Sequence, residues 1–118
     1  MARLFPIIIM AALGAAISPA NAAGYAPLDC GKASSPSEKA ICSDYELGQF
    51  EARVATLFEI TTSLVAMGQR GNIQDEQRAF LTQREACRAD VACLKNAYRT
   101  RIRQLEAVMT GIASHGPF

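Results

Sequence analysis

The sequence lacks the residues from which most catalytic sites are built. It contains one histidine, His115, so a Ser-His-Asp or Cys-His site has no placed base. No glycine-rich phosphate loop occurs either. The adjacent acids Asp75 and Glu76 would point roughly 100° apart on a helix, and they suit a helix N-terminus better than a glycosidase pair. We therefore predict a protein that is not an enzyme and that needs no cofactor.

Metal and nucleic-acid sites also lack their usual patterns. The cysteines stand at intervals of 12 and 6 residues, without the Cys-x-x-Cys knuckles or nearby histidines of zinc sites. The closely spaced Arg99, Arg101 and Arg103 spread around a helix instead of lining one face. We expect neither a bound metal nor a nucleic-acid partner.

The one long apolar run lies at the N-terminus and is shorter than the roughly 20 residues of a membrane span. Arg3 precedes the apolar residues 4–17, and Ala20-Asn21-Ala22 forms an Ala-x-Ala cleavage site. We predict a signal peptide over residues 1–22, cleaved after Ala22, which leaves 96 residues and no stable membrane anchor. A lipoprotein is not expected, because the residues before Cys30 are not the small ones that such anchors use.

Neither charge is in excess after this cleavage, but the distribution is uneven. Residues 23–77 hold 4 basic and 8 acidic groups, whereas residues 78–118 hold 7 basic and 3 acidic groups. One explanation is an acidic surface for a cationic partner, or a basic surface for an anionic glycan. The other, which we favour, is that the two halves pack together and complement each other.

The sequence does contain helical periodicity and clear helix starts. It shows no sustained strand alternation, internal repeats or low-complexity segments. Ser35, Pro36 and Glu38 form a capping box at the start of a short helix. Asp44 begins a long amphipathic helix from Tyr45 to about Met67. We expect Gly68 to Gly71 to end it, Asn72 to cap a third helix reaching Cys87, and Asp90 to cap a fourth that ends at Gly111.

The prediction is therefore an all-α fold: a small disulfide-stapled helical bundle or hairpin with one short and three longer helices. The domain would span residues 23–110, followed by a flexible tail over residues 111–118. Its organising stretch is Gln77 to Tyr98, where Cys87 and Cys93 bracket the turn between two helices.

Motif residues in a fixed order resemble a family of small exported bacterial domains, the one named after the LprI lysozyme inhibitor. The resemblance covers residues 30–105 and departs from the family pattern at Glu51 for Asp, Phe58 for Tyr and Phe80 for Trp. The matching positions are Cys30 with SSPSEKAIC (Ser34 to Cys42); Leu47, Phe50, Glu51, Val54 and Phe58; Gln77, Phe80, Leu81, Arg84 and Cys87; and Cys93, Tyr98, Arg101, Ile102 and Leu105.

This resemblance implies a bacterial source and a periplasmic or secreted location. It implies a protein that binds and blocks lysozyme-type muramidases without chemistry of its own, with lysozyme as the partner. The acidic portion from Asp29 to Glu59 would then steer it toward a cationic lysozyme. The alternative is a non-inhibitory module that binds another envelope protein or a glycan, with the basic last helix as the contact.

Disulfides are the expected state of all four cysteines in a small exported domain. Of the three possible connectivities, we predict Cys30–Cys42 and Cys87–Cys93, both of which are local.

Four polar motif residues flank apolar stripes, where an unpaired charge would be costly. We predict that Glu51 and Arg84 pair across helices and that Gln77 and Arg101 join them. The alternative for all four positions is a polar patch that faces a partner.

Overall fold

The computed structural model describes residues 28–115, and the signal peptide predicted over residues 1–22 lies outside this range. Within it the chain is helical, with no strand, so the all-α prediction with one short and three longer helices is confirmed. The elements are the short 3-10 helix η2 (Cys30–Lys32), α1 (Pro36–Ser43), α2 (Tyr45–Leu64), α3 (Met67–Ala86) and α4 (Val91–Ser114).

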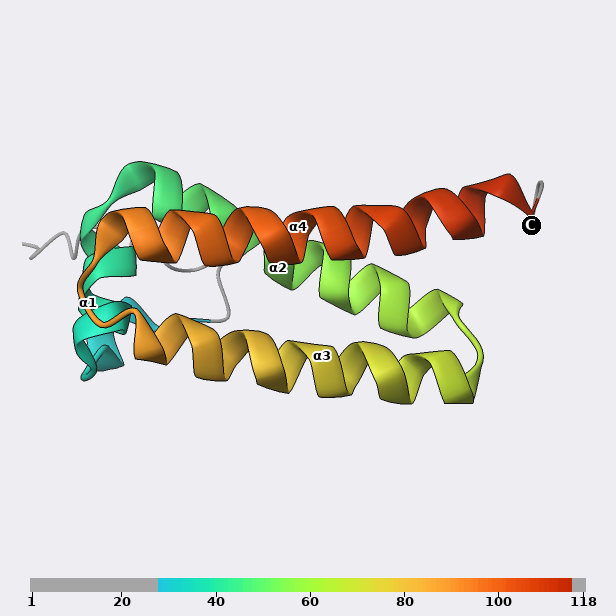
Figure 1. Cartoon of the computed structure of the whole chain (residues 1–118), viewed down its shortest axis with the longest axis horizontal. Helices are drawn as coiled ribbons and strands as arrows, with labels where there is room; N and C mark the ends of the chain where they lie inside the picture. Colours follow the sequence, from blue (N-terminus) through green and yellow to red (C-terminus); the bar gives the residue numbers. More distant parts are fainter. Residues whose placement is uncertain (1–27, 116–118) are drawn as a thin grey trace, which may run out of the picture.

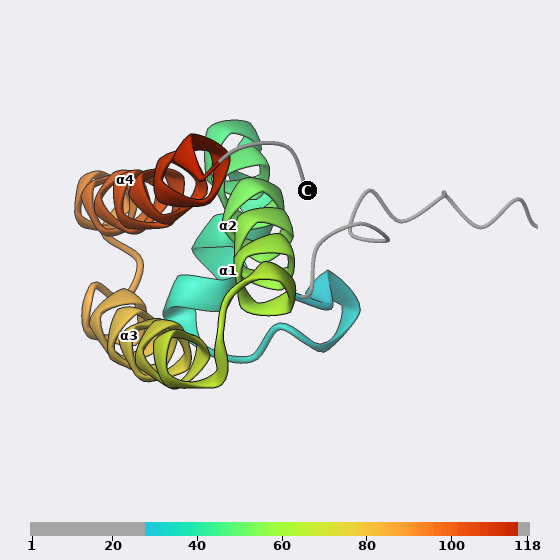
Figure 2. The same cartoon turned by 90° about the vertical axis from the view of Figure 1, so that its right-hand side faces the viewer.

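The three long helices run back and forth along the molecule, and α1 closes one end of them (Figure 1). At this end α2 begins, α3 finishes and α4 begins. Viewed along the helices, α2, α3 and α4 surround a common interior that α1 also borders (Figure 2). We call the closed end the disulfide end, because Cys30–Cys42 and Cys87–Cys93 both lie there, and the opposite end the α2–α3 turn end.

A single apolar core joins the helices. Leu47 of α2 and Leu94, Tyr98 and Leu105 of α4 have no exposed surface. Tyr98 packs its ring edge-on against Phe80 of α3, with the ring centroids 5.1 Å apart. The other buried apolar residues are Ile41, Val54, Val65, Ile73 and Ile102.

The helix starts that the sequence predicted are present at three places. The Ser35 hydroxyl accepts a hydrogen bond from the Glu38 amide (3.1 Å) at the start of α1. Asp44 caps α2 by accepting from the Leu47 amide. Asp90 caps α4 in the same way. These caps satisfy helix amides that have no partner within the helix.

The predicted break at Gly68 to Gly71 is wrong, and so is the cap at Asn72. The chain turns at Val65 and Ala66, and α3 already begins at Met67. Val65 is buried in the core, which fixes the turn there. Arg70 secures it by donating to the carbonyl oxygens of Thr62 (2.6 Å) and Val65 (3.4 Å), two of the free carbonyls at the end of α2. This anchoring outweighs the roughly 1 kcal/mol that a helical glycine costs.

The predicted helix end at Gly111 is also wrong, because α4 continues to Ser114 and His115 is its C-cap. Ile112 packs against the core one residue beyond the glycine. That contact holds the last turn in helical form, so part of the segment expected to be a flexible tail is helix. The remaining tail residues, 116–118, lie outside the described range.

Candidate functional site

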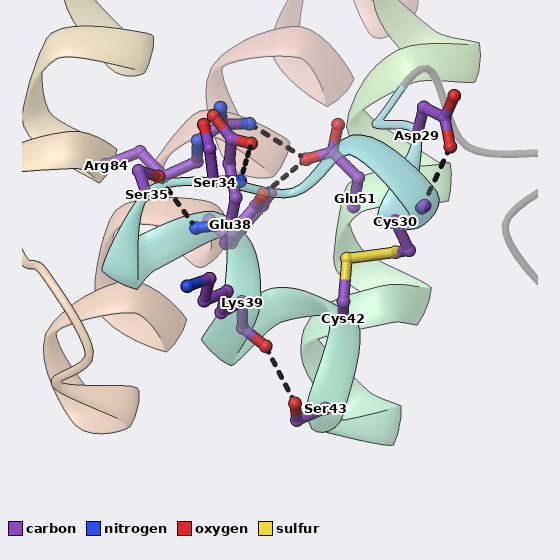
Figure 3. Close-up of a disulfide and its surroundings, with 12 residues drawn as sticks. Asp29, Cys30, Ser34, Ser35, Glu38, Lys39, Cys42, Ser43, Glu51 and Arg84 are labelled. Atoms are coloured by element: carbon purple, nitrogen blue, oxygen red, sulfur yellow. Dashed lines mark hydrogen bonds and ion pairs between the residues drawn. A yellow bond between two sulfur atoms is a disulfide. The ribbon is translucent and has the colours of Figure 1, made fainter.

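The two disulfides staple the elements at the disulfide end. Cys30–Cys42 ties η2 to α1 (Cα–Cα 5.7 Å; Figure 3), and Cys87–Cys93 closes the turn between α3 and α4 (Cα–Cα 5.5 Å). These are the two pairs that we predicted. Disulfides persist in oxidising, extracytoplasmic compartments. No helix within residues 28–115 is long and apolar enough to cross a membrane.

Glu51, Arg84 and Tyr98 form a buried polar cluster between the three long helices, toward the disulfide end, which we call the Glu51 cluster. The Arg84 Nη1 donates to Glu51 Oε2 at 3.4 Å, and the Tyr98 hydroxyl donates to the same oxygen. The Glu51 and Arg84 side chains are 7% and 9% exposed. Because Glu51 comes from α2, Arg84 from α3 and Tyr98 from α4, the cluster links all three long helices (Figure 3 shows Glu51 and Arg84).

The surroundings shift the pKa values of Tyr98 and Arg84. Burial, the Glu51 charge and the hydrogen bond to Glu51 raise the pKa of Tyr98 far above its ordinary value, so the phenol keeps its proton and donates it. Burial alone would lower the pKa of Arg84, but the neighbouring Tyr98 and Glu51 outweigh it and raise that pKa. In this cluster one oxygen of Glu51 therefore accepts hydrogen bonds from two donors, the Tyr98 hydroxyl and the Arg84 guanidinium.

Glu85 extends the network to the start of α1. Its carboxylate accepts from Arg84 Nη2 at 3.2 Å. Partial burial opposes ionisation, but the hydroxyls of Ser37 and Ser35 and the Arg84 guanidinium together lower the pKa of Glu85. Ser37 is itself fully buried. The end of α3 is thus joined to the first turn of α1.

Arg101 organises a second buried cluster, with a guanidinium that is 1% exposed. It donates to Gln77 Oε1 (2.8 Å), to Glu76 Oε2 (3.0 Å), to Gln104 Oε1 (3.1 Å) and to the carbonyl oxygen of Ile73 (3.0 Å). We call this the Arg101 cluster. Gln77 and Arg101 therefore meet each other, but no hydrogen bond among residues 28–115 connects them to Glu51 or Arg84.

All four polar motif residues thus have partners inside the molecule. Among the described residues no buried side-chain nitrogen or oxygen is left without a hydrogen-bond partner. The sequence reasoning missed Tyr98 and Glu76 as members of the clusters. A tyrosine within an otherwise aliphatic stripe was the signal for Tyr98, since a buried hydroxyl needs a partner. Glu76 gave no signal beyond its charge.

The uneven charge distribution is absorbed by packing. Six ion pairs join a residue of the acidic half to one of the basic half from another part of the bundle: Arg53–Glu106, Arg84–Glu51, Lys95–Asp44, Lys95–Glu46, Arg99–Glu46 and Arg101–Glu76. The favoured explanation, two complementary halves, therefore accounts for most of the asymmetry. Glu51 is buried and Glu46 is paired, whereas Asp29, Glu38 and Glu59 form no ion pair among the described residues.

The most exposed apolar side chains lie at the two opposite ends of the molecule. Tyr45 at the disulfide end is 84% exposed, and Met67 at the α2–α3 turn end is 82% exposed, with Leu64 beside it at 53%. An open groove of about 310 Å³ adjoins this turn, lined in part by Leu64, Val65 and Ile112. At the turn end, exposed apolar side chains and a groove therefore occur together.

Residues 28–115 contain no group of three or more histidine, cysteine, aspartate or glutamate side chains that could hold a metal ion. In comparisons with protein-family models, curated proteins and solved structures, nothing matches the chain. The resemblance to the LprI-like family therefore rests on the motif residues alone.

Proposed function

We propose that this protein is a periplasmic or secreted bacterial inhibitor that binds lysozyme-type muramidases and blocks their cleft. The observation that carries the proposal is the ordered set of LprI-like motif residues over positions 30–105. Those residues have a common structural purpose in the bundle: Glu51, Gln77, Arg84 and Arg101 bind other helices, and the cysteines staple its end. In this protein the motif positions therefore carry contacts that hold the bundle together.

An inhibitor of this kind needs no catalytic group. It has only to cover a cleft in which two carboxylates and the sugar subsites are exposed. The polar motif residues bind other helices of this protein. The contact with lysozyme must therefore use other residues that are exposed at the surface. We assign it to the α2–α3 turn end, where Leu64 and Met67 offer apolar side chains on a narrow turn next to a groove. Methionine is well suited to such a contact, since its flexible side chain adapts to an irregular surface.

The acidic portion from Asp29 to Glu59 remains a weaker candidate for steering. Glu46 and Asp44 already face Lys95, and Glu51 is inaccessible. Three carboxylates of this portion, Asp29, Glu38 and Glu59, form no ion pair among the described residues, so association with a cationic lysozyme is expected to depend moderately on salt.

The test is whether chicken-, goose- or invertebrate-type lysozymes bind the exported, disulfide-bonded protein and lose activity on cell-wall substrate as they bind. For a lysozyme that binds this protein, the L64S/M67S double variant of the protein is expected to inhibit more weakly, by about tenfold or more. Loss of a central apolar contact has an effect of this size. The Y45S variant is the matched control, because it removes an equally exposed ring from the opposite end. Equal inhibition by both variants would contradict the assignment of the contact.

Failure of the folded protein to bind any of the three lysozyme types would contradict the inhibitor proposal itself. The function would then be the alternative, an envelope module that binds another protein or a glycan without inhibiting lysozyme.

A further inference from the structure

A second groove lies between α2 and α4, away from the α2–α3 turn, and its walls are rich in arginine. It has a volume of about 250 Å³. Helix α2 contributes Phe50 and Arg53. Helix α4 contributes Ile102 and the charged residues Arg99, Arg103 and Glu106. Neither buried polar cluster supplies a residue to it.

The groove concentrates positive charge on a molecule that is nearly neutral. It holds three arginines and one glutamate, whereas the whole chain has a formal net charge of +1. Arg53 is paired with Glu106 and is 59% exposed. Arg103 donates only to the Thr100 hydroxyl, and no ion pair forms at it within residues 28–115. Arg99 pairs with Glu46, so among the described residues Arg103 is the arginine of this groove whose charge no ion pair neutralises.

Arg99 is held in position before any ligand arrives. Its guanidinium carbon lies 5.6 Å from the centroid of the Phe50 ring, and its Nη2 donates to Glu46 at 3.0 Å. A guanidinium stacked on an aromatic ring keeps donors on its edge that can bind a carboxylate or phosphate. Positioning of this kind reduces the entropy that an arginine loses on binding.

The apolar part of the lining suits a particular class of ligand. Phe50, which is partly exposed, provides carbon surface beside the arginines, and a sugar ring presents a face of C–H groups beside its polar substituents. A volume of about 250 Å³ is slightly below the ~300–1,000 Å³ of drug-sized pockets. It therefore suits one ring of a chain better than an extended polymer surface.

We propose that this groove binds one anionic sugar unit of a polysaccharide, with Arg99 and Arg103 contacting its carboxylate or phosphate and the partly exposed Phe50 contacting the ring. This activity is separate from lysozyme inhibition and uses another face of the molecule. The lysozyme contact is assigned to the α2–α3 turn end, whose groove shares no lining residue with this one, so the two proposals do not share a surface.

The test is titration of the exported, disulfide-bonded protein with oligogalacturonate, followed by the amide NMR signals of Phe50 and Ile102. Saturable shifts at these residues are expected, with no shift from the fully methyl-esterified oligosaccharide at the same concentration. The R99Q/R103Q double variant is expected to weaken binding about tenfold or more, because it removes two charge-assisted contacts. The R78Q/R88Q variant is the matched control, since it changes net charge equally at arginines outside the groove.

Equal weakening in both double variants would overturn the proposal, because binding would then follow net charge alone. So would the absence of shifts at Phe50 and Ile102 with oligogalacturonate. Inorganic phosphate alone, titrated in parallel, is expected to bind more weakly; equal affinity would show that the sugar ring contributes nothing. Lysozyme is absent from every arm, so the outcome is independent of the inhibitor proposal.

Discussion

At the scale of single residues, the polar motif positions hold helices together rather than face a partner. Glu51 illustrates this, because one carboxylate oxygen binds Arg84 of α3 and Tyr98 of α4. Replacing a whole buried ion pair by apolar residues is often neutral, whereas removing one member costs about 3–5 kcal/mol. Such a pair therefore sets which helices meet and in what register, more than it adds net stability.

A double-mutant cycle measures this link directly. Arg84→Ala is expected to lower the free energy of unfolding by about 3–5 kcal/mol, since it leaves Glu51 buried without its cation. The double variant with Glu51→Ala should lose less than the sum of the two single losses. We expect a coupling energy of about 0.5–3 kcal/mol in urea unfolding.

The outcome that contradicts the pair is strict additivity of the two losses. Because a small domain has only about 5–15 kcal/mol of stability in total, the alanine variants can fail to fold. The milder pair Glu51→Gln and Arg84→Lys then completes the cycle. Arg84→Lys tests the geometry as well, because an ammonium cannot span Glu51 and Glu85 as the guanidinium does.

The contacts of Glu85 lead us to expect that part of the free energy of unfolding is lost in acid. Its folded-state pKa lies below the ordinary value of 4.5, so its contribution is fully present above that pH and is lost as pH falls through the folded-state pKa. We expect the free energy of unfolding to fall with pH below about 4.5, and Glu85→Gln to flatten part of that fall. Urea unfolding from pH 6 to pH 3 measures it.

The matched control for Glu85 is Glu59→Gln, an exposed carboxylate on α2 that forms no ion pair among the described residues. It is expected to leave the slope unchanged. An equal change in slope for both variants would mean that overall charge, and not the contact of Glu85 with α1 and Arg84, produces the acid sensitivity.

At the scale of helices, the sequence predicts starts better than ends. Ser35, Asp44 and Asp90 begin helices through hydrogen bonds to amides two or three residues away, so the signal is local. The ends of α2 and α4 depend on distant contacts, namely the burial of Val65 and the packing of Ile112. A glycine weakens a helix by only about 1 kcal/mol, and these contacts exceed it.

The continuation of α4 through Gly111 is testable by substitution. A Cβ added at Gly111 meets nothing within 4 Å. Gly111→Ala is therefore expected to raise the free energy of unfolding by about 0.5–1 kcal/mol, which corresponds to several degrees in Tm for a domain of this size. Thermal unfolding followed by circular dichroism measures the change.

Gly31→Ala is the control for that substitution. Its added Cβ would approach Asp29 Oδ1 to 3.2 Å, and Gly31 lies in η2 rather than in a long helix. No gain is expected there. A Gly111→Ala variant with unchanged or lower Tm would contradict the helix that we describe at this position.

At the scale of the whole molecule, the sequence allowed the class of fold and both disulfide pairs to be predicted. It also indicated that Glu51 and Arg84 meet, because charges on apolar stripes must find partners. It did not indicate that Arg101 and Gln77 form a separate cluster, since that depends on how α3 and α4 are offset. The sequence also did not predict that Leu64 and Met67 are exposed, because helical spacing alone does not show which apolar residues remain uncovered.

The disulfides make the whole fold sensitive to reduction. Each closes a short loop, and in the chain-entropy model each contributes about 2–3 kcal/mol. Together they are a large share of the stability of a domain with so small a core. Reduction is thus expected to unfold the molecule and to remove any binding surface built on its helices.

The most direct measurement is the rate at which chicken-type lysozyme lyses cell-wall substrate as the exported, disulfide-bonded protein is titrated in. The inhibitor proposal predicts that the rate falls to its minimum near a 1:1 molar ratio, and that the reduced protein has no effect. An undiminished rate at excess oxidised protein, with its helices verified by circular dichroism, would contradict inhibition of this enzyme. Persistent inhibition by reduced, unfolded protein would contradict the requirement for the stapled bundle.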